Sequence, residues 1–224
     1  MNLKYIYDKI SLEYDKRYVS DVHLTEDKII KHILTSSINP NESILDIGCG
    51  TGHAISLGNL SVQNYLGIDF SKGMINDAKF KYPDYKFIVK DINKFGDNYK
   101  YDVLLAVYGQ VNYLGLDTFC KILKKHGNKT YKFFSVLYAH KEHEDYSYTN
   151  EYQSYFTHNQ ILDAMKKNGI DCYVKGFSFN NTKATYENNL NLTLNKNLDD
   201  NNDCKYFILS NLNIFNGENK WLKM

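Results

Sequence analysis

Short apolar runs alternate with helix-like segments along most of the chain. Between several of these runs, apolar residues recur at helical spacing, as they do in residues 116–125. Strands that alternate with helices predict a parallel sheet that is covered by helices on both faces. The runs that predict buried strands are residues 43–47, 65–68, 85–89, 101–108, 131–138 and 170–179.

The first forty residues predict helices. Residues 3–18 place tyrosine and isoleucine at helical spacing, which indicates one amphipathic helix or two short ones. Thr25 is a candidate cap for the next helix, and Glu26 and Asp27 are then expected as acids in its first turn.

Two later helices carry their own boundary signals. Ser71 is of the residue type that caps a helix, and the segment that follows it runs toward Phe80. Thr157 is a similar cap, and Gly169 is placed where a glycine ends a helix.

The carboxyl-terminal third has a different pattern. Leucines alternate with polar residues over 190–194, which predicts a half-exposed antiparallel strand, and residues 205–212 predict a final strand. Residues 139–156 show no clear period and predict a long loop or broken helix, of the kind that often covers a binding site. The expected fold is a doubly wound, mostly parallel α/β sheet with an antiparallel edge.

Composition narrows the choice of function. The 224 residues carry 27 basic and 26 acidic side chains, and this balance argues against a surface built to neutralise phosphates. No apolar run approaches 20 residues, and the first sixteen residues are too polar for a secretory signal. The four cysteines have no paired spacing, which is typical of reduced thiols in the cytoplasm.

The strongest motif lies where the first strand hands over to a helix. Its sequence is Asp-Ile-Gly-Cys-Gly-Thr-Gly, from Asp46 to Gly52. Glycines at positions 48, 50 and 52 allow a ligand to approach the backbone closely, and Asp46 can accept hydrogen bonds from an amino group. Such a loop at the carboxyl end of a strand is the usual ligand site of an open α/β sheet.

The glycine spacing argues against a dinucleotide site. A dinucleotide fingerprint needs G-x-G-x-x-G, whereas this loop reads G-x-G-x-G with His53 next. An anion site would also not place a carboxylate two residues before the first glycine. The pattern suits a ligand that has a cationic amino acid end and no phosphate.

The chain at this point resembles the class I S-adenosylmethionine-dependent methyltransferases, over roughly residues 7–179. The resemblance implies a Rossmann-like, seven-stranded sheet in a single domain over residues 1–224. It implies that the loop from Asp46 to Gly52 holds the amino acid part of S-adenosylmethionine, with Cys49 as a spacer. It also implies that Asp69, which ends the second strand, holds both ribose hydroxyls.

The same resemblance assigns the rest of the cofactor site. Residues around the adenine and the methionine chain are expected on successive strand ends, and S-adenosylhomocysteine is the expected product. The residues that it implies are Tyr14, Phe70, Met74, Asp91, Ile92, Val107 and Tyr108.

Negative evidence favours a small acceptor. The chain lacks the [DN]-P-P-[YF] motif of amino methylation on adenine or glutamine and the Pro-Cys of pyrimidine C-methylation, and no RNA-binding module is recognisable. Tyrosine-rich segments are expected around the acceptor: a helical lid within residues 1–38, the stretch 108–113, and the insertion 139–156. Tyrosine is abundant throughout the chain, so these rings could equally belong to the core.

The candidate general base is His140, which follows the fifth strand and can accept a proton near neutral pH. With His143 it could also reach a metal ion, but a third ligand of fixed spacing is missing, so solvated loop histidines and no metal are expected. His53 is expected to open a helix.

The sequence therefore predicts a cytoplasmic methyltransferase, monomeric or homodimeric, that methylates an oxygen or nitrogen of a small polar metabolite. The alternatives are an RNA- or protein-directed methyltransferase and a non-catalytic module that binds the cofactor.

Overall fold

The computed structural model describes residues 2–17, 21–96, 99–139, 152–179, 192–193 and 206–212. His140 and most of the expected insertion 139–156 therefore lie outside the described residues. The strands are β1 (Ile44–Ile47), β2 (Tyr65–Asp69), β3 (Lys86–Val89), β4 (Tyr101–Ala106), β5 (Gly127–Tyr138), β6 (Tyr173–Phe179), β7 (Leu192–Thr193) and β8 (Tyr206–Ser210).

Helices connect these strands and precede them. The α-helices are α1 (Leu3–Ile10), α2 (Asp21–Ser37), α3 (His53–Gly58), α4 (Lys72–Lys81), α5 (Gln110–Leu114), α6 (Leu116–His126) and α7 (His158–Lys167). Short 3₁₀ helices are η1 (Ser11–Glu13), η2 (Asp15–Arg17), η3 (Val62–Asn64) and η4 (Ile92–Lys94). None of the helices in the described ranges combines the length and the apolar character needed to cross a membrane.

The described strands form one sheet in the order β3-β2-β1-β4-β5-β8-β6-β7. Strands β1 to β5 are parallel, whereas β8 runs antiparallel between β5 and β6. The predicted fold class is confirmed: the sheet is doubly wound and mostly parallel, and the two-residue β7 is added at its antiparallel edge. The chain order reverses between β1 and β4, which is where open α/β sheets bind ligands.

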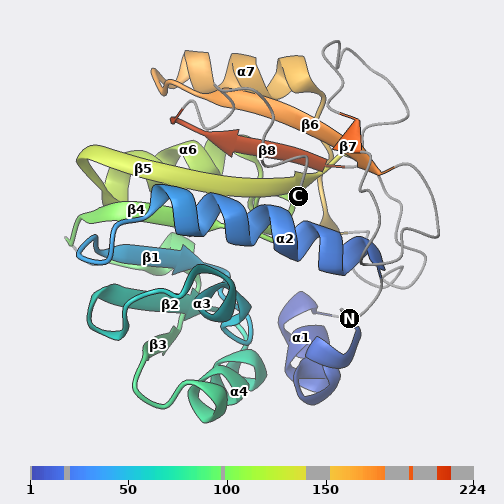
Figure 1. Ribbon diagram of the computed structural model, residues 1–224, viewed down its shortest axis with the longest axis vertical. Coiled ribbons are helices and arrows are strands. Elements are labelled where there is room, and N and C mark those ends of the chain that lie inside the picture. The colour runs from blue at the N-terminus through green and yellow to red at the C-terminus, as the bar shows by residue number, and fades with distance from the viewer. Residues whose placement is uncertain are drawn as a thin grey trace.

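Two apolar clusters cover the two faces of the sheet. Successive residues of strand β4 contribute to opposite faces: Val103 and Leu105 belong to one cluster, and Leu104 belongs to the other. Helix α2 lies across the first face, as Figure 1 shows, and contributes Ile30 and Leu34 to that cluster. Helices α6 and α7 fill the second cluster. A strand buried on both faces has to be apolar at successive positions, as this one is.

The predicted helix caps are largely confirmed. The Ser71 hydroxyl accepts a hydrogen bond from the Met74 backbone at 3.1 Å, and Thr157 forms a capping box with Gln160. The prediction for Thr25 is wrong, because α2 begins at Asp21 and Thr25 lies inside it. The earlier start moves Glu26 and Asp27 out of the first turn, and Glu26, four residues before Ile30, lies on the buried side of the helix.

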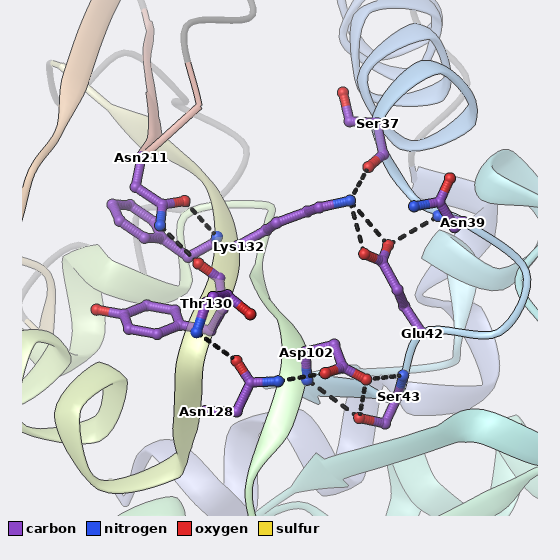
Figure 2. Close-up of polar contacts among 11 residues, drawn as sticks. Ser37, Asn39, Glu42, Ser43, Asp102, Asn128, Thr130, Lys132 and Asn211 are labelled. Atoms are coloured by element: carbon purple, nitrogen blue, oxygen red, sulfur yellow. Dashed lines mark hydrogen bonds and ion pairs between the residues drawn. The ribbon is translucent and has the colours of Figure 1, made fainter.

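A polar network joins the amino ends of the strands, on the side opposite the switch-point loops. The Lys132 ammonium of β5 lies 2.7 Å from a Glu42 carboxylate oxygen and donates to the Ser37 carbonyl at 2.9 Å, as Figure 2 shows. Asp102 of β4 accepts two further bonds from Ser43. These contacts tie the end of α2 to the starts of β1, β4 and β5.

Replacing Lys132 with methionine is expected to lower the free energy of unfolding by about 2 kcal/mol, because a half-buried Glu42 carboxylate and the Ser37 carbonyl lose their cationic donor. Urea unfolding followed by circular dichroism measures the change. Lys121→Met on the exposed face of α6 is the matched control and is expected to stay within about 0.5 kcal/mol of the parent. Equal stability of the two variants would show that the network contributes nothing.

Candidate active site

A pocket opens at the carboxyl ends of β1, β2 and β4, with a volume of about 850 Å³ when space open to solvent is included. It brings together eight of the residues that the sequence indicated: Tyr14, Gly48, Cys49, Gly50, Asp69, Phe70, Met74 and Tyr108. Its remaining lining residues are Tyr7, Asp15, Asp27, Thr51, His53, Gln110 and Tyr113. The switch point of the sheet is thus the position of this pocket.

The glycine loop forms one wall of the pocket. Its backbone has a conformation that would be strained for residues other than glycine. Gly48, Gly50 and Gly52 have φ angles of 68°, 52° and 83°, in the left-handed region that favours glycine. The N–H groups of Gly48 and Cys49 both donate to the Ile68 carbonyl, at 2.7 and 3.1 Å. These bonds fold the loop back over the end of β2.

Asp69 ends β2 and faces the pocket from the other side of this loop. Its two carboxylate oxygens accept backbone N–H groups, one from Ser71 at 2.8 Å and the other from Gly50 at 3.1 Å. Burial raises the pKa of this carboxyl to about 6. Each oxygen keeps a further lone pair, so the carboxylate can still accept two donors from a ligand.

Asp46 lies beneath the glycine loop and is not among the residues that line the pocket. Its side chain is 1% exposed, and the Tyr65 hydroxyl donates to Oδ2 at 2.7 Å. Burial raises its pKa to about 7. Its Oδ1 atom is buried and accepts no hydrogen bond from the described residues.

Four other residues implied by the family resemblance also lie outside the pocket lining. Gly52 precedes α3 and faces the Tyr82 ring, while Val107 and Ile92 are buried in the two apolar clusters. Asp91 accepts from the Asn93 backbone at 3.0 Å and so caps η4. The structure thus gives these four positions packing or capping contacts.

Tyr108 leaves β4 in a conformation that is unusual for its residue type. Its φ angle is 57°, and Gly109 follows at 72°. A non-glycine residue in this region costs roughly 1 kcal/mol or more, and such strain concentrates at functional sites. The turn aims the Tyr108 hydroxyl at an Asp27 carboxylate oxygen, 2.7 Å away.

Asp27 and His53 complete this side of the pocket. The second carboxylate oxygen of Asp27 lies 2.8 Å from His53 Nε2, and the His53 ring lies 5.7 Å from the Tyr108 ring. His53 opens α3 as expected. Neither residue was predicted to line the site, because a lone aspartate inside a helix has no spacing that marks it.

Residues of α1 and η2 line the pocket, and two aspartates tie these helices to α4 and to the glycine loop. Asp8 of α1 accepts the Gly73 backbone N–H at the start of α4, at 2.9 Å. Asp15 of η2 accepts the Thr51 hydroxyl of the glycine loop at 2.7 Å and pairs with Lys81. In Figure 1 α1 lies beside α4, near the carboxyl ends of the strands.

Aromatic rings from three segments meet at this side of the pocket. The Tyr7 ring lies about 6 Å from the rings of Tyr14, Phe70 and Tyr113, and the Tyr7 hydroxyl donates to the Tyr113 hydroxyl at 2.8 Å. Gln153, from the chain that returns after β5, donates to the same Tyr113 oxygen at 2.5 Å. Tyrosines of the first segment and of residues 108–113 therefore meet at one place, where Gln153 joins them, while most of the insertion 139–156 lies outside the described residues.

Residues 38–170, more than half of the chain, match a family model described as a methyltransferase domain. The chain belongs to this methyltransferase domain family. The domain is 29% identical over 139 residues to the ubiquinone/menaquinone biosynthesis C-methyltransferase of Campylobacter jejuni. This match covers 54% of this chain and 59% of that protein. The chain spans about half the length of the curated relatives it matches.

Solved structures share the fold of this methyltransferase domain. A SAM-dependent methyltransferase from Thermotoga maritima superposes with a TM-score of 0.67 at 13% identity, covering 93% of this chain and 98% of that one. Magnesium protoporphyrin IX methyltransferase from Synechocystis, solved with bound SAM, has a TM-score of 0.58 at 13% identity and covers 95% and 98%. The cofactor implied by the sequence, S-adenosylmethionine, is therefore a cofactor of this fold.

The residues of the methyltransferase domain fit that cofactor on three observations. The left-handed glycine loop leaves its backbone open to the pocket, and no side-chain or backbone atom lies within 4 Å of where a Gly50 Cβ would be. Asp69 has spare acceptor capacity beside this loop. Asp46 keeps an orphaned buried oxygen beneath it. Among the described residues no group of three His, Cys, Asp or Glu side chains could hold a metal ion.

Proposed function

We propose that this chain transfers a methyl group from S-adenosylmethionine to an oxygen or nitrogen of a small polar molecule. The observation that carries the proposal is that the glycine loop, Asp69 and the strained Tyr108 turn all line one pocket. When bound, S-adenosylmethionine supplies an electrophilic methyl group on a sulfonium sulfur.

Each part of this pocket lining has a separate task. The Asp69 carboxylate accepts the two ribose hydroxyls with the lone pairs that Gly50 and Ser71 leave free. Phe70 and Met74, which also line the pocket, supply apolar surface for the adenine ring. The glycine loop carries the amino acid end. The chain thereby orients the donor and keeps water from the reacting atoms.

The covering segment supports a small acceptor. Helix α1 and η2 lie over the pocket and are tied to α4 and the glycine loop through Asp8 and Asp15. We assign these residues to the lid that was expected over residues 1–38, whereas α2 packs Ile30 and Leu34 on the sheet and contributes Asp27 to the pocket lining. The described residues that line the pocket include no lysine or arginine, so these residues offer no cation for nucleic acid phosphates.

Binding and transfer assays test the proposal. Calorimetry is expected to show S-adenosylmethionine and S-adenosylhomocysteine binding, whereas NAD, for which the glycine spacing is wrong, is expected not to bind. Mass spectrometry of small-molecule mixtures incubated with protein and cofactor is expected to find methylated products. Absence of measurable affinity for both nucleosides would overturn the proposal. His140 remains the candidate base for a hydroxyl acceptor, and His140→Ala in the same assay measures its contribution.

A further inference from the structure

The side of the pocket next to β4 is left free once the donor is placed. The strand order puts β2 and β4 on opposite sides of β1 and its glycine loop. With the nucleoside assigned to Asp69, at the end of β2, the acceptor is assigned to the region around Tyr108, at the end of β4, although the family resemblance had set Tyr108 beside the donor. This step rests on the proposed function.

Asp27 is the charged group on that side. Three carboxylates line the pocket: Asp69 is assigned to the donor, and Asp15 pairs with Lys81, an ammonium that it shares with Asp77. Among the described residues, the partners of Asp27 are the Tyr108 hydroxyl and the His53 ring, and neither is a permanent cation. Its side chain is 18% exposed, so a ligand can reach it. Within the part of the chain that the structure describes, this carboxylate thus reaches the cavity with no lysine or arginine paired to it.

The walls around this carboxylate are aromatic. Tyr108 packs beside it, and the cluster of Tyr7, Tyr14 and Tyr113 lines the same pocket. Aromatic faces together with a carboxylate are the combination that recognises an organic ammonium group, through cation–π attraction and a charge-assisted hydrogen bond. An anionic acceptor such as a carboxylic acid would instead meet repulsion from Asp27.

We propose that the acceptor is a small organic amine whose nitrogen is held by Asp27 within this tyrosine wall. The ammonium form binds by donating a hydrogen bond to the carboxylate. The ammonium group then gives one proton to the Asp27 carboxylate and the His53 ring that is hydrogen-bonded to it. This leaves the amine with a free lone pair.

The chemical balance of the step is simple. The nitrogen lone pair forms the new N–C bond while the C–S bond of the donor breaks, and the bonding pair stays on sulfur. The methylated ammonium and one proton are released. His53, whose side chain is 41% exposed, passes that proton to bulk water. Tyr108 fixes the carboxylate for this exchange through its 2.7 Å hydrogen bond.

Acceptors matched in shape test the proposal. Two sets are used, namely 2-phenylethylamine with 2-phenylethanol and phenylacetate, and propylamine with propanol and propionate. In calorimetry on the protein loaded with S-adenosylhomocysteine, each amine is expected to bind roughly tenfold more tightly than its alcohol, with the acid weakest. Mass spectrometry is expected to place the transferred methyl group on nitrogen.

Asp27→Asn identifies the residue responsible. It is expected to raise the KM or Kd for the amine by roughly tenfold or more while the affinity for S-adenosylhomocysteine changes by less than about twofold. Asp163→Asn on the exposed face of α7 is the matched control and is expected to change neither quantity.

Three outcomes overturn the inference and leave the proposed function standing. They are amines that bind no better than their alcohols, methylation found only on oxygen or carbon, and an Asp27→Asn variant with unchanged amine affinity. Loss of S-adenosylhomocysteine binding in the parent protein would instead remove the proposed function itself.

Discussion

Asp69→Ala is expected to weaken binding of S-adenosylhomocysteine by about 3 kcal/mol, or roughly a hundredfold, because two charge-assisted hydrogen bonds to the ribose are lost. The parent protein is also expected to lose affinity below about pH 6, because burial raises the Asp69 pKa to about 6 and the protonated carboxyl accepts less well. Calorimetry at pH 5, 6 and 7.5 measures both effects.

Two further variants separate binding from folding. Asp69 also accepts the Gly50 and Ser71 backbone N–H groups, so its loss could loosen the loop. Asp69→Asn keeps one acceptor oxygen and is expected to fold while still binding at least roughly tenfold more weakly. Asp84→Ala on the surface is the control and is expected to bind normally. A folded Asp69→Asn protein with unchanged affinity would remove Asp69 from the ribose role.

Glu26→Gln is expected to change how stability depends on pH. Glu26 is 3% exposed, its Oε1 has no hydrogen-bond partner among the described residues, and burial together with the charge of Asp27 raises its pKa to about 8. Between pH 4.5 and 8 the unfolded chain ionises this group while the folded chain keeps it protonated. The folded state therefore loses about 1.4 kcal/mol per pH unit over this range.

The amide variant lacks this loss. The difference in unfolding free energy between Glu26→Gln and the parent is therefore expected to move in favour of the variant by roughly 4 kcal/mol from pH 5 to pH 8. The contributions of Asp46 and Asp69 have the same sign but are common to both proteins, so they cancel. Urea unfolding at several pH values measures the difference, with Glu13→Gln on the surface as control. Parallel stability curves for parent and Glu26→Gln would contradict the expectation.

Local sequence signals account for the parts of the site that were predicted. Neighbours within a few residues determine the glycine loop, the place of Asp69 at a strand end and the Ser71 cap. These features can therefore be predicted from short sequence patterns. The alternation of strands and helices predicted a mostly parallel sheet but no strand order, and the interior place of β8 depends on its pairing with both β5 and β6.

The Asp27 side of the pocket could not be predicted for the opposite reason. Its carboxylate meets Tyr108 and His53, which are 81 and 26 residues away in sequence. Nothing in the local pattern of α2 separates this aspartate from any other polar helix position. The left-handed turn at Tyr108 was equally hidden, because tyrosine carries no preference for that conformation. Only the folded backbone brings these three groups together.

The position of α2 bears on how the domain can be shortened. The family match begins at residue 38 and ends at 170, yet Ile30 and Leu34 lie in the apolar cluster on one face of the sheet, and β8 covers the edge of β5. A recombinant fragment that begins and ends at the match boundaries would expose an apolar face of the sheet and the unpaired edge of β5 to water. Such a fragment is expected to aggregate, so the expressed protein needs the flanking residues on both sides.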